Sequence, residues 1–252
     1  MNNYGIETYT ALFRFYAELN DFLPFGRRSI SFPYTFTGNP SVKDAIEAIG
    51  VPHVEIDLVI VNGEPVNFTY KLREGDQVSV YPVFESLDIS EVSPLRAKPL
   101  RKTKFITDVH LGKLTRYLRL CGFDTYYRKE LTDNEIVDIS LSEGRIILTR
   151  DKGLLKNKKV THGYWVRSPE PKEQLTEVLH RFDLKQELKP FTRCMECNEQ
   201  VSVVSKEEIG EQLPPKTRKY FMEFKRCPGC GKIYWEGSHY DKMKKFIETL
   251  KA

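Results

Sequence analysis

The chain has 252 residues, of which 40% are hydrophobic and 12% aromatic, and its formal net charge is +4. This composition supplies enough apolar side chains for two or three packed domains and excludes general disorder. The weak positive charge permits a nucleic-acid partner without indicating one, because the clustering of charge matters more than its total. No apolar run approaches the ~20 residues of a membrane span, and the N-terminus lacks the pattern of a secretory signal. We therefore expect a cytoplasmic protein with no membrane contact.

Residues 1–92 predict a small mixed domain. Two strand-forming segments precede a short helix over residues 41–50, which Ser41 caps, and Asn62-Gly63 is a strong turn signal between further strands. This order resembles the β-grasp, ubiquitin-like fold, which includes small sulfur carriers. A carrier needs a terminal Gly-Gly, whereas here the domain runs on into the next segment without one. We therefore expect a docking or packing module with a protein as its partner.

Residues 93–103 form a predicted linker with two prolines and a cluster of cations. The cluster is either part of a solvated connector or a phosphate-attracting stripe beside the next domain, and both interpretations stay open. Its members are Arg96, Lys98, Arg101, Lys102 and Lys104.

Residues 104–187 alternate between strands and helices, which predicts an α/β domain with a parallel sheet. Ligands of such sheets lie at the carboxyl ends of the strands. Two acids fall there, because Asp108 follows the strand "KFIT" and Asp151 follows "RIILT" after one residue. The predicted strands are 104–108, 124–128 and 145–149, and the predicted helices are 110–121, 133–143 and 170–181.

Asp133 offers a third carboxylate in the first turn of its helix, near the centre of the apolar stripe, so it would face the strand ends. The alternative is compensation of the helix dipole, which needs no metal. Glu135 instead completes a capping box with Thr132 and has a local role. Three converging carboxylates repel one another and need a cation. Hard oxygen ligands select Mg²⁺ or Mn²⁺, which can activate water for phosphodiester cleavage.

The predicted helix over residues 110–121 carries a basic row at i, i+3 spacing. Lys113 and Arg116 are predicted contacts for a nucleic-acid backbone, with an ordinary solvated face as the alternative, and the solvated role is the expectation for Arg119. Arg150 would restrain the carboxylate that follows it or contact phosphate.

Four of the five cysteines form two C-x2-C pairs, Cys194 with Cys197 and Cys227 with Cys230. Four thiolates at this spacing suit a closed, tetrahedral Zn²⁺ site, with iron–sulfur ligation as the alternative. The fifth, Cys121, fits the apolar stripe of its helix and is expected to be inert.

Residues 188–252 are therefore predicted to form a zinc ribbon followed by a basic amphipathic helix. The gap between the two cysteine pairs exceeds the usual ribbon spacing, so "PPKTRKYFMEF" is expected to be an insertion. The segment "KIYWEGSHY" mixes aromatic and basic residues, which suit stacking on unpaired bases or packing within the ribbon. The role of His239 stays open.

Three stretches, "FITDVHLGKLTRYLRLCGFDT", "TDNEIVDIS" and "EGRIILTRDKGLL", strongly resemble the PIN-like RNase family named after the C-terminal region of the Mut-seven exonuclease. The resemblance covers residues 104–240, and the first domain resembles the ubiquitin-like domain often fused in front of that family. It implies that Asp108, Asp133 and Asp151 are the acidic metal ligands. Many PIN relatives carry a further acid on an intervening helix, for which this sequence has no match, so the number of metal ions stays open.

We expect a metal-dependent ribonuclease that hydrolyses RNA phosphodiester bonds at the three aspartates with Mg²⁺ or Mn²⁺, and a ribbon held by structural Zn²⁺. The alternative is a non-catalytic RNA-binding or adaptor protein that uses the ribbon and the ubiquitin-like domain. A phosphatase for small molecules is a third interpretation. The sequence does not identify the RNA or the oligomeric state. It also does not distinguish RNA from single-stranded DNA as the substrate, or endonucleolytic from exonucleolytic cleavage.

Overall fold

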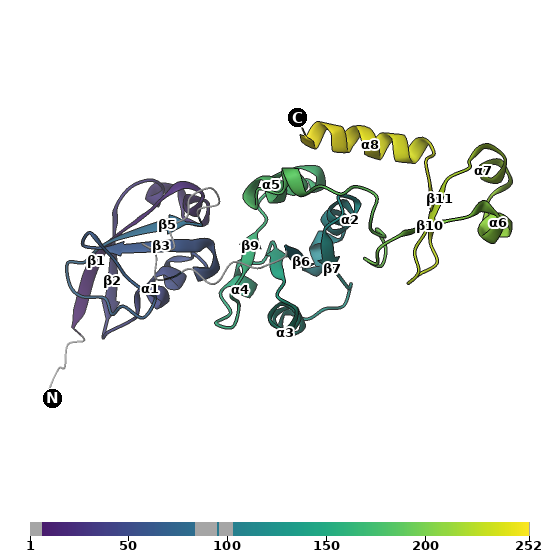
Figure 1. The fold of residues 1–252 in the computed structure, drawn as a ribbon. Coiled ribbons are helices and arrows are strands. Elements are labelled where there is room, and N and C mark those ends of the chain that lie inside the picture. Colours follow the sequence, from purple (N-terminus) through teal and green to yellow (C-terminus); the bar gives the residue numbers. More distant parts are fainter. Residues whose placement is uncertain (1–6, 84–94, 96–102, 252) are drawn as a thin grey trace. The chain divides into compact units, whose positions relative to one another are not determined.

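The computed structural model describes residues 7–83, 95 and 103–251, without the side chains of His239 and Lys251. The chain divides into two compact units. Unit 1 comprises Met1–Arg101 and Asp151–Trp165, and unit 2 comprises Lys102–Arg150 and Val166–Ala252. Figure 1 shows their elements, coloured along the sequence.

Most of the predicted linker cations lie outside the described residues. Lys104 is the exception, since it is the first residue of a strand in unit 2. The phosphate-attracting stripe therefore stays a prediction, as do the domain boundaries on either side of it. The cations concerned are Arg96, Lys98, Arg101 and Lys102.

Unit 1 contains a mixed five-stranded sheet in the order β2-β1-β5-β3-β4. The central pair, β1 and β5, is parallel, and the other neighbours are antiparallel. Together with helix α1 this is the β-grasp arrangement of ubiquitin-like domains, as predicted. The elements are β1 (Thr8–Phe15), η1 (Ala17–Phe22), η2 (Phe25–Arg27), β2 (Phe32–Thr37), α1 (Val42–Ile49), η3 (His53–Glu55), β3 (Ile56–Val61), β4 (Glu64–Pro65) and β5 (Gln77–Pro82).

Local signals in the sequence place several of these elements. The Ser41 hydroxyl accepts a hydrogen bond from Asp44 N at 3.1 Å, and the Asp44 carboxylate accepts one from Ser41 N, so a capping box opens α1. Asn62 and Gly63 have φ values of +52° and +92°, which suit the tight turn between β3 and β4. The buried core includes Phe13, Phe15, Phe32, Ile46, Val59 and Val80.

The segment Asp151–Trp165 belongs to unit 1, although residues of unit 2 precede and follow it in the chain. His53 Nε2 lies 3.0 Å from the carbonyl oxygen of Val160, and Glu55 Oε1 accepts a hydrogen bond from Trp165 N at 2.6 Å. These contacts join the segment to η3. Its elements are α4 (Lys152–Leu155) and β9 (Gly163–Trp165).

Unit 2 begins with an α/β part in which β7, β6 and β8 are neighbours in that order, and both pairings are parallel. This confirms the predicted parallel sheet. Phe105 in β6 aligns with Thr125 in β7 and Ile146 in β8, so the carboxyl ends of the strands meet at one edge. The elements are β6 (Lys104–Thr107), η4 (Val109–Leu111), α2 (Gly112–Leu120), β7 (Asp124–Tyr126), α3 (Asp133–Glu143), β8 (Ile146–Thr149), α5 (Pro171–Arg181) and η5 (Lys185–Glu187).

A close backbone approach joins the α/β part to the cysteine-bearing part of the same unit. Gly122 has a φ of +98°, and a Cβ there would lie 2.3 Å from the carbonyl oxygen of Lys189, so only glycine fits. Lys189 N donates to the Cys121 carbonyl at 2.9 Å, and Phe191 N donates to the Leu120 carbonyl at 3.0 Å.

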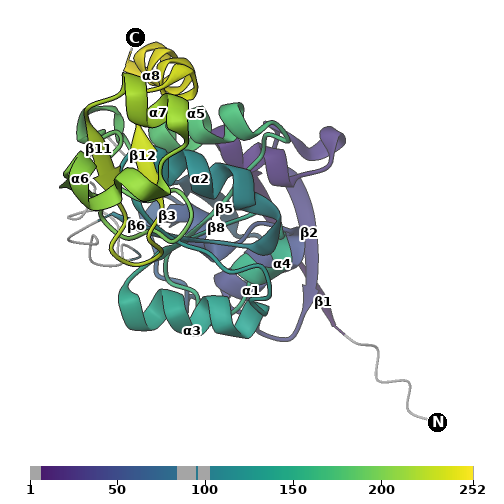
Figure 2. The same cartoon turned by 90° about the vertical axis from the view of Figure 1, so that its right-hand side faces the viewer.

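The cysteine-bearing part is built on an antiparallel sheet in the order β10-β11-β12. Short helices lie between β10 and β11 in the chain (Figure 2). Ile209 and Leu213 from this stretch form a buried cluster with Phe224 of β11. Neither the last helix, α8, nor any other helix in the described parts of the chain is long and apolar enough to cross a membrane. The elements are β10 (Ser202–Val204), α6 (Lys206–Ile209), η6 (Gly210–Gln212), α7 (Pro215–Tyr220), β11 (Phe224–Arg226), β12 (Ile233–Trp235) and α8 (Ser238–Lys251).

Candidate functional site

Asp108 lies at the carboxyl end of β6, where it caps the 3-10 turn η4, and only 5% of its surface is exposed. Its Oδ1 accepts a hydrogen bond from His110 N at 2.8 Å. Its Oδ2 accepts one from Arg150 N at 2.9 Å and one from the Thr149 hydroxyl, both at the end of β8. The carboxylate is thus oriented by donors from the turn after β6 and from the end of β8. An ionised carboxylate has about four acceptor directions, so capacity for a cation remains.

The threonine before Asp108 fixes the turn that follows it. The buried Thr107 hydroxyl lies 2.7 Å from the hydroxyl of Thr115, which in turn donates to the Leu111 carbonyl at 3.0 Å. This chain of hydrogen bonds ties the end of β6 to the first turn of α2. The threonine is therefore a positioning residue for the acid, a role that the sequence pattern did not reveal.

Asp133 is the first residue of α3, and its side chain is exposed. The predicted capping box is present, because Glu135 N donates to the Thr132 hydroxyl at 3.3 Å and Thr132 N donates to the Glu135 carboxylate at 2.8 Å. Glu135 therefore has the local role expected of it. Within the described residues, the Asp133 carboxylate has no hydrogen-bond or ionic partner.

Asp151 caps α4, and its Oδ1 accepts a hydrogen bond from Gly153 N at 2.7 Å. Its side chain is exposed, and it belongs to unit 1, whereas Asp108 and Asp133 belong to unit 2. The convergence of the three carboxylates at one metal site stays a prediction.

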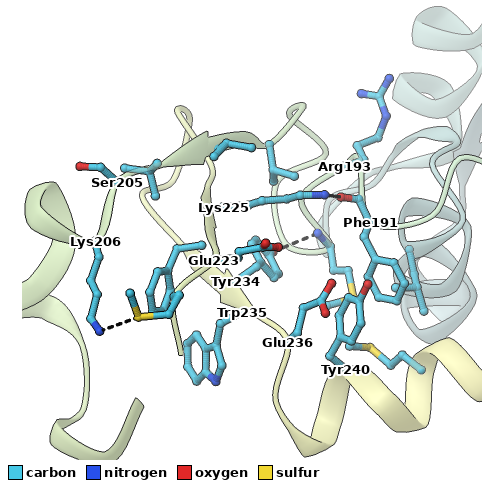
Figure 3. Close-up of a pocket in the computed structure, with 18 of the residues that line it drawn as sticks. Phe191, Arg193, Ser205, Lys206, Glu223, Lys225, Tyr234, Trp235, Glu236 and Tyr240 are labelled. Carbon is cyan, nitrogen blue, oxygen red and sulfur yellow. Dashed lines mark hydrogen bonds between the residues drawn. The ribbon is translucent and has the colours of Figure 1, made fainter. Parts of the chain in front are cut away.

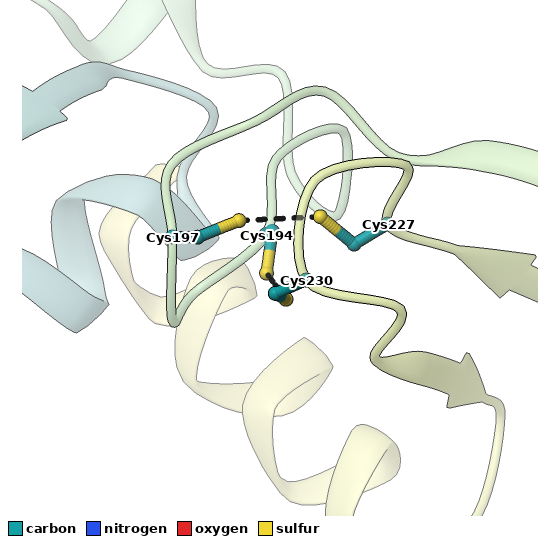
Figure 4. Close-up of side chains that lie close together, drawn as sticks. All are labelled: Cys194, Cys197, Cys227 and Cys230. Atoms are coloured by element: carbon teal, nitrogen blue, oxygen red, sulfur yellow. Dashed lines mark hydrogen bonds between the residues drawn. The ribbon is translucent and has the colours of Figure 1, made fainter.

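The four predicted zinc ligands come together in unit 2 (Figure 4). All four Sγ atoms lie within 4.8 Å of one another, with 3.6 Å between Cys194 and Cys230 and 3.2 Å between Cys197 and Cys227. A tetrahedral ion with Zn–S bonds of ~2.3 Å needs sulfurs roughly 3.8 Å apart. The thiolate set and its spacing therefore fit a single Zn²⁺ and leave no room for a multi-iron cluster. Among the described residues, these four side chains form the group of three or more His, Cys, Asp or Glu ligands whose ligand atoms lie this close together.

Each cysteine pair lies on a turn of the same design. Asn198 N donates to the Cys194 carbonyl and Gly231 N to the Cys227 carbonyl, both at 3.0 Å. Asn198 and Gly231 have φ values of +77° and +74°, the left-handed conformation in which asparagine and glycine are favoured. The two turns thus direct their sulfurs toward a common point.

Tyr234 on β12 contacts the cysteine cluster. Its hydroxyl lies 3.1 Å from Cys194 Sγ and accepts a hydrogen bond from Met195 N at 3.2 Å. Burial and the neighbouring sulfur raise the pKa of Tyr234, so its hydroxyl keeps its proton and can donate to the thiolate. Such outer contacts orient metal ligands and tune their affinity.

Arg119 joins the first cysteine turn to the α/β part, and only 3% of its surface is exposed. Its Nε donates to the Thr125 carbonyl at 2.9 Å, and its Nη1 donates to the carbonyls of Glu196 and Met195 at 2.6 and 3.2 Å. The expectation that Arg119 is solvated is wrong, because the ribbon covers this end of α2. Helical spacing alone cannot show what a distant segment covers.

A second connection passes through Asn198. Its amide donates to Asp124 Oδ1 at 2.8 Å and accepts a hydrogen bond from Thr125 N at 3.0 Å. Arg145, which is also buried, donates to Asp124 Oδ1 at 2.7 Å and to the Phe105 carbonyl at 3.1 Å. Burial alone would raise the pKa of Asp124, but hydrogen bonds from Arg145 and Asn198 outweigh it and lower that pKa. These polar groups link the ribbon to Phe105 in β6, three residues before Asp108.

Two family models match the chain. A family model described as the Mut7-C RNAse domain matches residues 103–247, and one described as Mut7-C ubiquitin matches residues 8–88. The chain belongs to the Mut7-C RNAse domain family. No curated protein and no solved structure matches it. The family indicates a nuclease-type function for unit 2, and it confirms the resemblance found in the sequence, including the ubiquitin-like first domain.

The basic side chains of the Mut7-C domain differ in what they contact. Lys113 is exposed, and within the described residues it has no ionic partner. Arg116 Nη2 pairs with both carboxylate oxygens of Glu196 at 2.6 and 2.7 Å, and Lys232 pairs with the same carboxylate at 2.7 Å. Hydrogen bonds from Arg116 and Lys232 lower the pKa of Glu196 to about 2. The Arg150 guanidinium donates to backbone carbonyls of residues 166–168.

A cavity of about 680 Å³ lies on the ribbon of the Mut7-C domain (Figure 3). Apolar side chains such as Val203, Met222 and Trp235 line it, and the first two are exposed. Its charged lining is balanced between three cations and three carboxylates, which are Arg193, Lys206, Lys225, Glu207, Glu223 and Glu236.

Proposed function

We propose that this chain is a metal-dependent ribonuclease that hydrolyses RNA phosphodiester bonds at Asp108, Asp133 and Asp151. The observation that carries the proposal is the buried, fully oriented carboxylate of Asp108 at the carboxyl edge of a parallel sheet, in a domain that matches the Mut7-C RNAse model. This edge is where parallel α/β sheets bind their ligands.

Mg²⁺ or Mn²⁺ suits the proposed ligands, because carboxylate oxygens are the donors that these hard ions prefer. Donors surround Asp108 but leave acceptor capacity, and Asp133 has no competing partner among the described residues. When bound, such an ion lowers the pKa of a coordinated water and stabilises charge on the phosphate oxygens. Thr149 and the backbone N of Arg150 hold the Asp108 carboxylate in place for that task.

Lys113 and Arg116 are the proposed contacts for the RNA backbone, since both project from α2, which begins four residues after Asp108. Phosphate binding at Arg116 would compete with its pair to Glu196. Arg150 is proposed to act at the same site. Its guanidinium donates to the backbone carbonyls of residues 166–168, and it directly precedes Asp151 in the sequence. Cytoplasmic location and a protein partner for the ubiquitin-like unit belong to the same proposal.

The test is cleavage of end-labelled single-stranded and structured RNA with Mg²⁺, Mn²⁺ or Ca²⁺. Asp133→Asn is the sharpest variant, because an exposed side chain can change without loss of fold, and Asp138→Asn on the same helix is its matched control. We expect the control to cleave and the Asp133, Asp108 and Asp151 variants to lose at least about a hundredfold in rate. Zinc content and melting temperature must match wild type in each.

Full activity in Asp133→Asn or Asp151→Asn would contradict the triple-aspartate site. EDTA alone is unsuitable as a control, because it would also remove Zn²⁺ from the ribbon. Binding of RNA without cleavage, equal in all variants, would instead support the non-catalytic RNA-binding or adaptor function.

A further inference from the structure

A second cavity, of about 670 Å³, lies in unit 2 where α2, β12 and α8 meet. Its lining contains five cations and a single acid, Glu196, which pairs with two of the cations. This cavity therefore carries a net positive charge, in contrast to the balanced lining of the apolar cavity. The cations are Lys113, Arg116, Lys172, Lys232 and Lys242.

Three of these cations are available to a ligand. Lys113, Lys172 and Lys242 are exposed, and none forms an ion pair with another described residue. Lys172 Nζ lies 4.9 Å from the ring centroid of Phe246, so this lysine covers an aromatic face of the cavity. The three lysines come from α2, α5 and α8, so tertiary packing brings them to one cavity.

Aromatic rings form much of the remaining lining. Tyr117 on α2 and Phe246 on α8 lie with their centroids 5.4 Å apart and their planes inclined by 54°. Both residues are half-buried, so part of each side chain is accessible to a ligand. The aromatic lining consists of Tyr117, Tyr234, Trp235, Tyr240 and Phe246.

We propose that this cavity, the α2–α8 cavity, binds a single-stranded nucleic acid. The phosphates would contact Lys113, Lys172 and Lys242, and unpaired bases would stack on the aromatic lining, which is the chemistry that single-strand binding sites use. Its volume is in the range that holds a nucleotide-sized ligand. A duplex would not fit this role, because its base faces are covered by their neighbours.

The α2–α8 cavity shares Lys113 with the proposed nuclease site, five residues after Asp108. A strand bound in the cavity would therefore lead along α2 toward the carboxyl edge of the sheet. Only this last point, that the bound strand is the substrate, rests on the proposed function.

The first test measures fluorescence anisotropy of 5′-labelled 20-mers with the full chain carrying Asp133→Asn. The cavity set is Lys113→Gln, Lys172→Gln and Lys242→Gln, and the matched control set is Lys129→Gln, Lys185→Gln and Lys245→Gln. The control lysines are exposed in the same unit but do not line the cavity. The probes are single-stranded RNA, single-stranded DNA, duplex RNA and polyglutamate.

We expect the cavity set to weaken binding of single-stranded RNA by roughly tenfold to a hundredfold near 0.1 M salt. The slope of log Kd against log salt should fall by about 2, since each single-strand phosphate contact contributes ~0.7. The control set should stay within about twofold of its parent. Equal binding of single-stranded DNA and single-stranded RNA would also support the proposal, and it would show that the cavity does not select the sugar.

A second readout tests stacking on Trp235, which lines both cavities. Trp165 and Trp235 are the two tryptophans of the chain, so Trp165→Phe leaves Trp235 as the reporter. Single-stranded RNA should quench its fluorescence, whereas inorganic polyphosphate should not, because polyphosphate has no base to stack. Equal quenching by both would overturn the stacking part of the proposal.

Unchanged binding in the cavity set, or an equal loss in the control set, would overturn the proposal. Tighter binding of duplex RNA than of single-stranded RNA would also overturn it. Polyglutamate binding that is weakened by the cavity set would overturn it too, because it would assign the cavity to an acidic protein. The two proposals fail separately. Loss of binding in the cavity set without any cleavage by wild type would leave the cavity assigned and reject the nuclease.

Discussion

Arg119 Nη1 donates a hydrogen bond to the backbone carbonyl of Glu196 at 2.6 Å, from the buried end of α2 to the first cysteine turn. The same side chain holds the Thr125 carbonyl in β7. A charged side chain that joins two backbone segments in this way orients the first cysteine turn against the sheet. The ribbon is thus attached to the α/β part by hydrogen bonds from the buried Arg119 side chain as well as by the chain itself.

Replacement of Arg119 by methionine should destabilise unit 2. Each buried carbonyl left without a donor costs roughly 1–3 kcal/mol, and we expect a loss of about 3 kcal/mol in the free energy of unfolding. Urea denaturation measures it. Arg128→Met is the control, since Arg128 forms an exposed pair with Glu135 and should cost less than about 1 kcal/mol. Equal losses in the two variants would contradict the role given to Arg119.

Replacement of Tyr234 by phenylalanine should weaken zinc binding by about tenfold to a hundredfold, because it removes the hydroxyl beside Cys194 Sγ. Competition with a chromophoric chelator measures the affinity. Tyr220→Phe, at an exposed position in the same part of the chain, should bind zinc as wild type does. Wild type should contain one zinc per chain, and Cys227→Ser should contain none.

Cys121 should resist alkylation in the folded chain. Burial raises the pKa of its thiol to about 12, so almost no thiolate exists at pH 8, and the side chain is inaccessible. Mass spectrometry after iodoacetamide treatment should find this residue modified only after unfolding. Labelling in the native, zinc-loaded protein would contradict the burial of this residue.

Acid should destabilise unit 2 partly through Asp124. Its pKa is lower in the folded chain than the ~3.9 of an unfolded one. The ionised Asp124 carboxylate therefore stabilises the folded chain above about pH 4, and this contribution is lost as the pH falls through the folded pKa. Asp124→Asn should flatten the dependence of unfolding free energy on pH below about 4, as measured by urea denaturation from pH 7 to 3. An acid dependence identical to that of wild type would exclude this contribution.

The sequence by itself determined the features that depend on neighbours along the chain. The capping boxes at Ser41 and Thr132, the turn at Asn62-Gly63 and the two cysteine turns each close within four residues. Strand and helix periodicity likewise identified the parallel sheet and placed Asp108 at the end of β6. Such features are readable because short-range hydrogen bonds and side-chain direction repeat with fixed periods.

Only the tertiary structure decided which residues meet across long stretches of chain. It buried Arg119 under a turn that comes more than seventy residues later, supplied the donors of Asp108 from β8, and joined Asp151–Trp165 to unit 1. It also brought Lys113, Lys172 and Lys242 to one cavity. These outcomes depend on the packing of whole elements, in which burial and hydrogen-bond pairing are satisfied jointly, and no local pattern in the sequence encodes the partner.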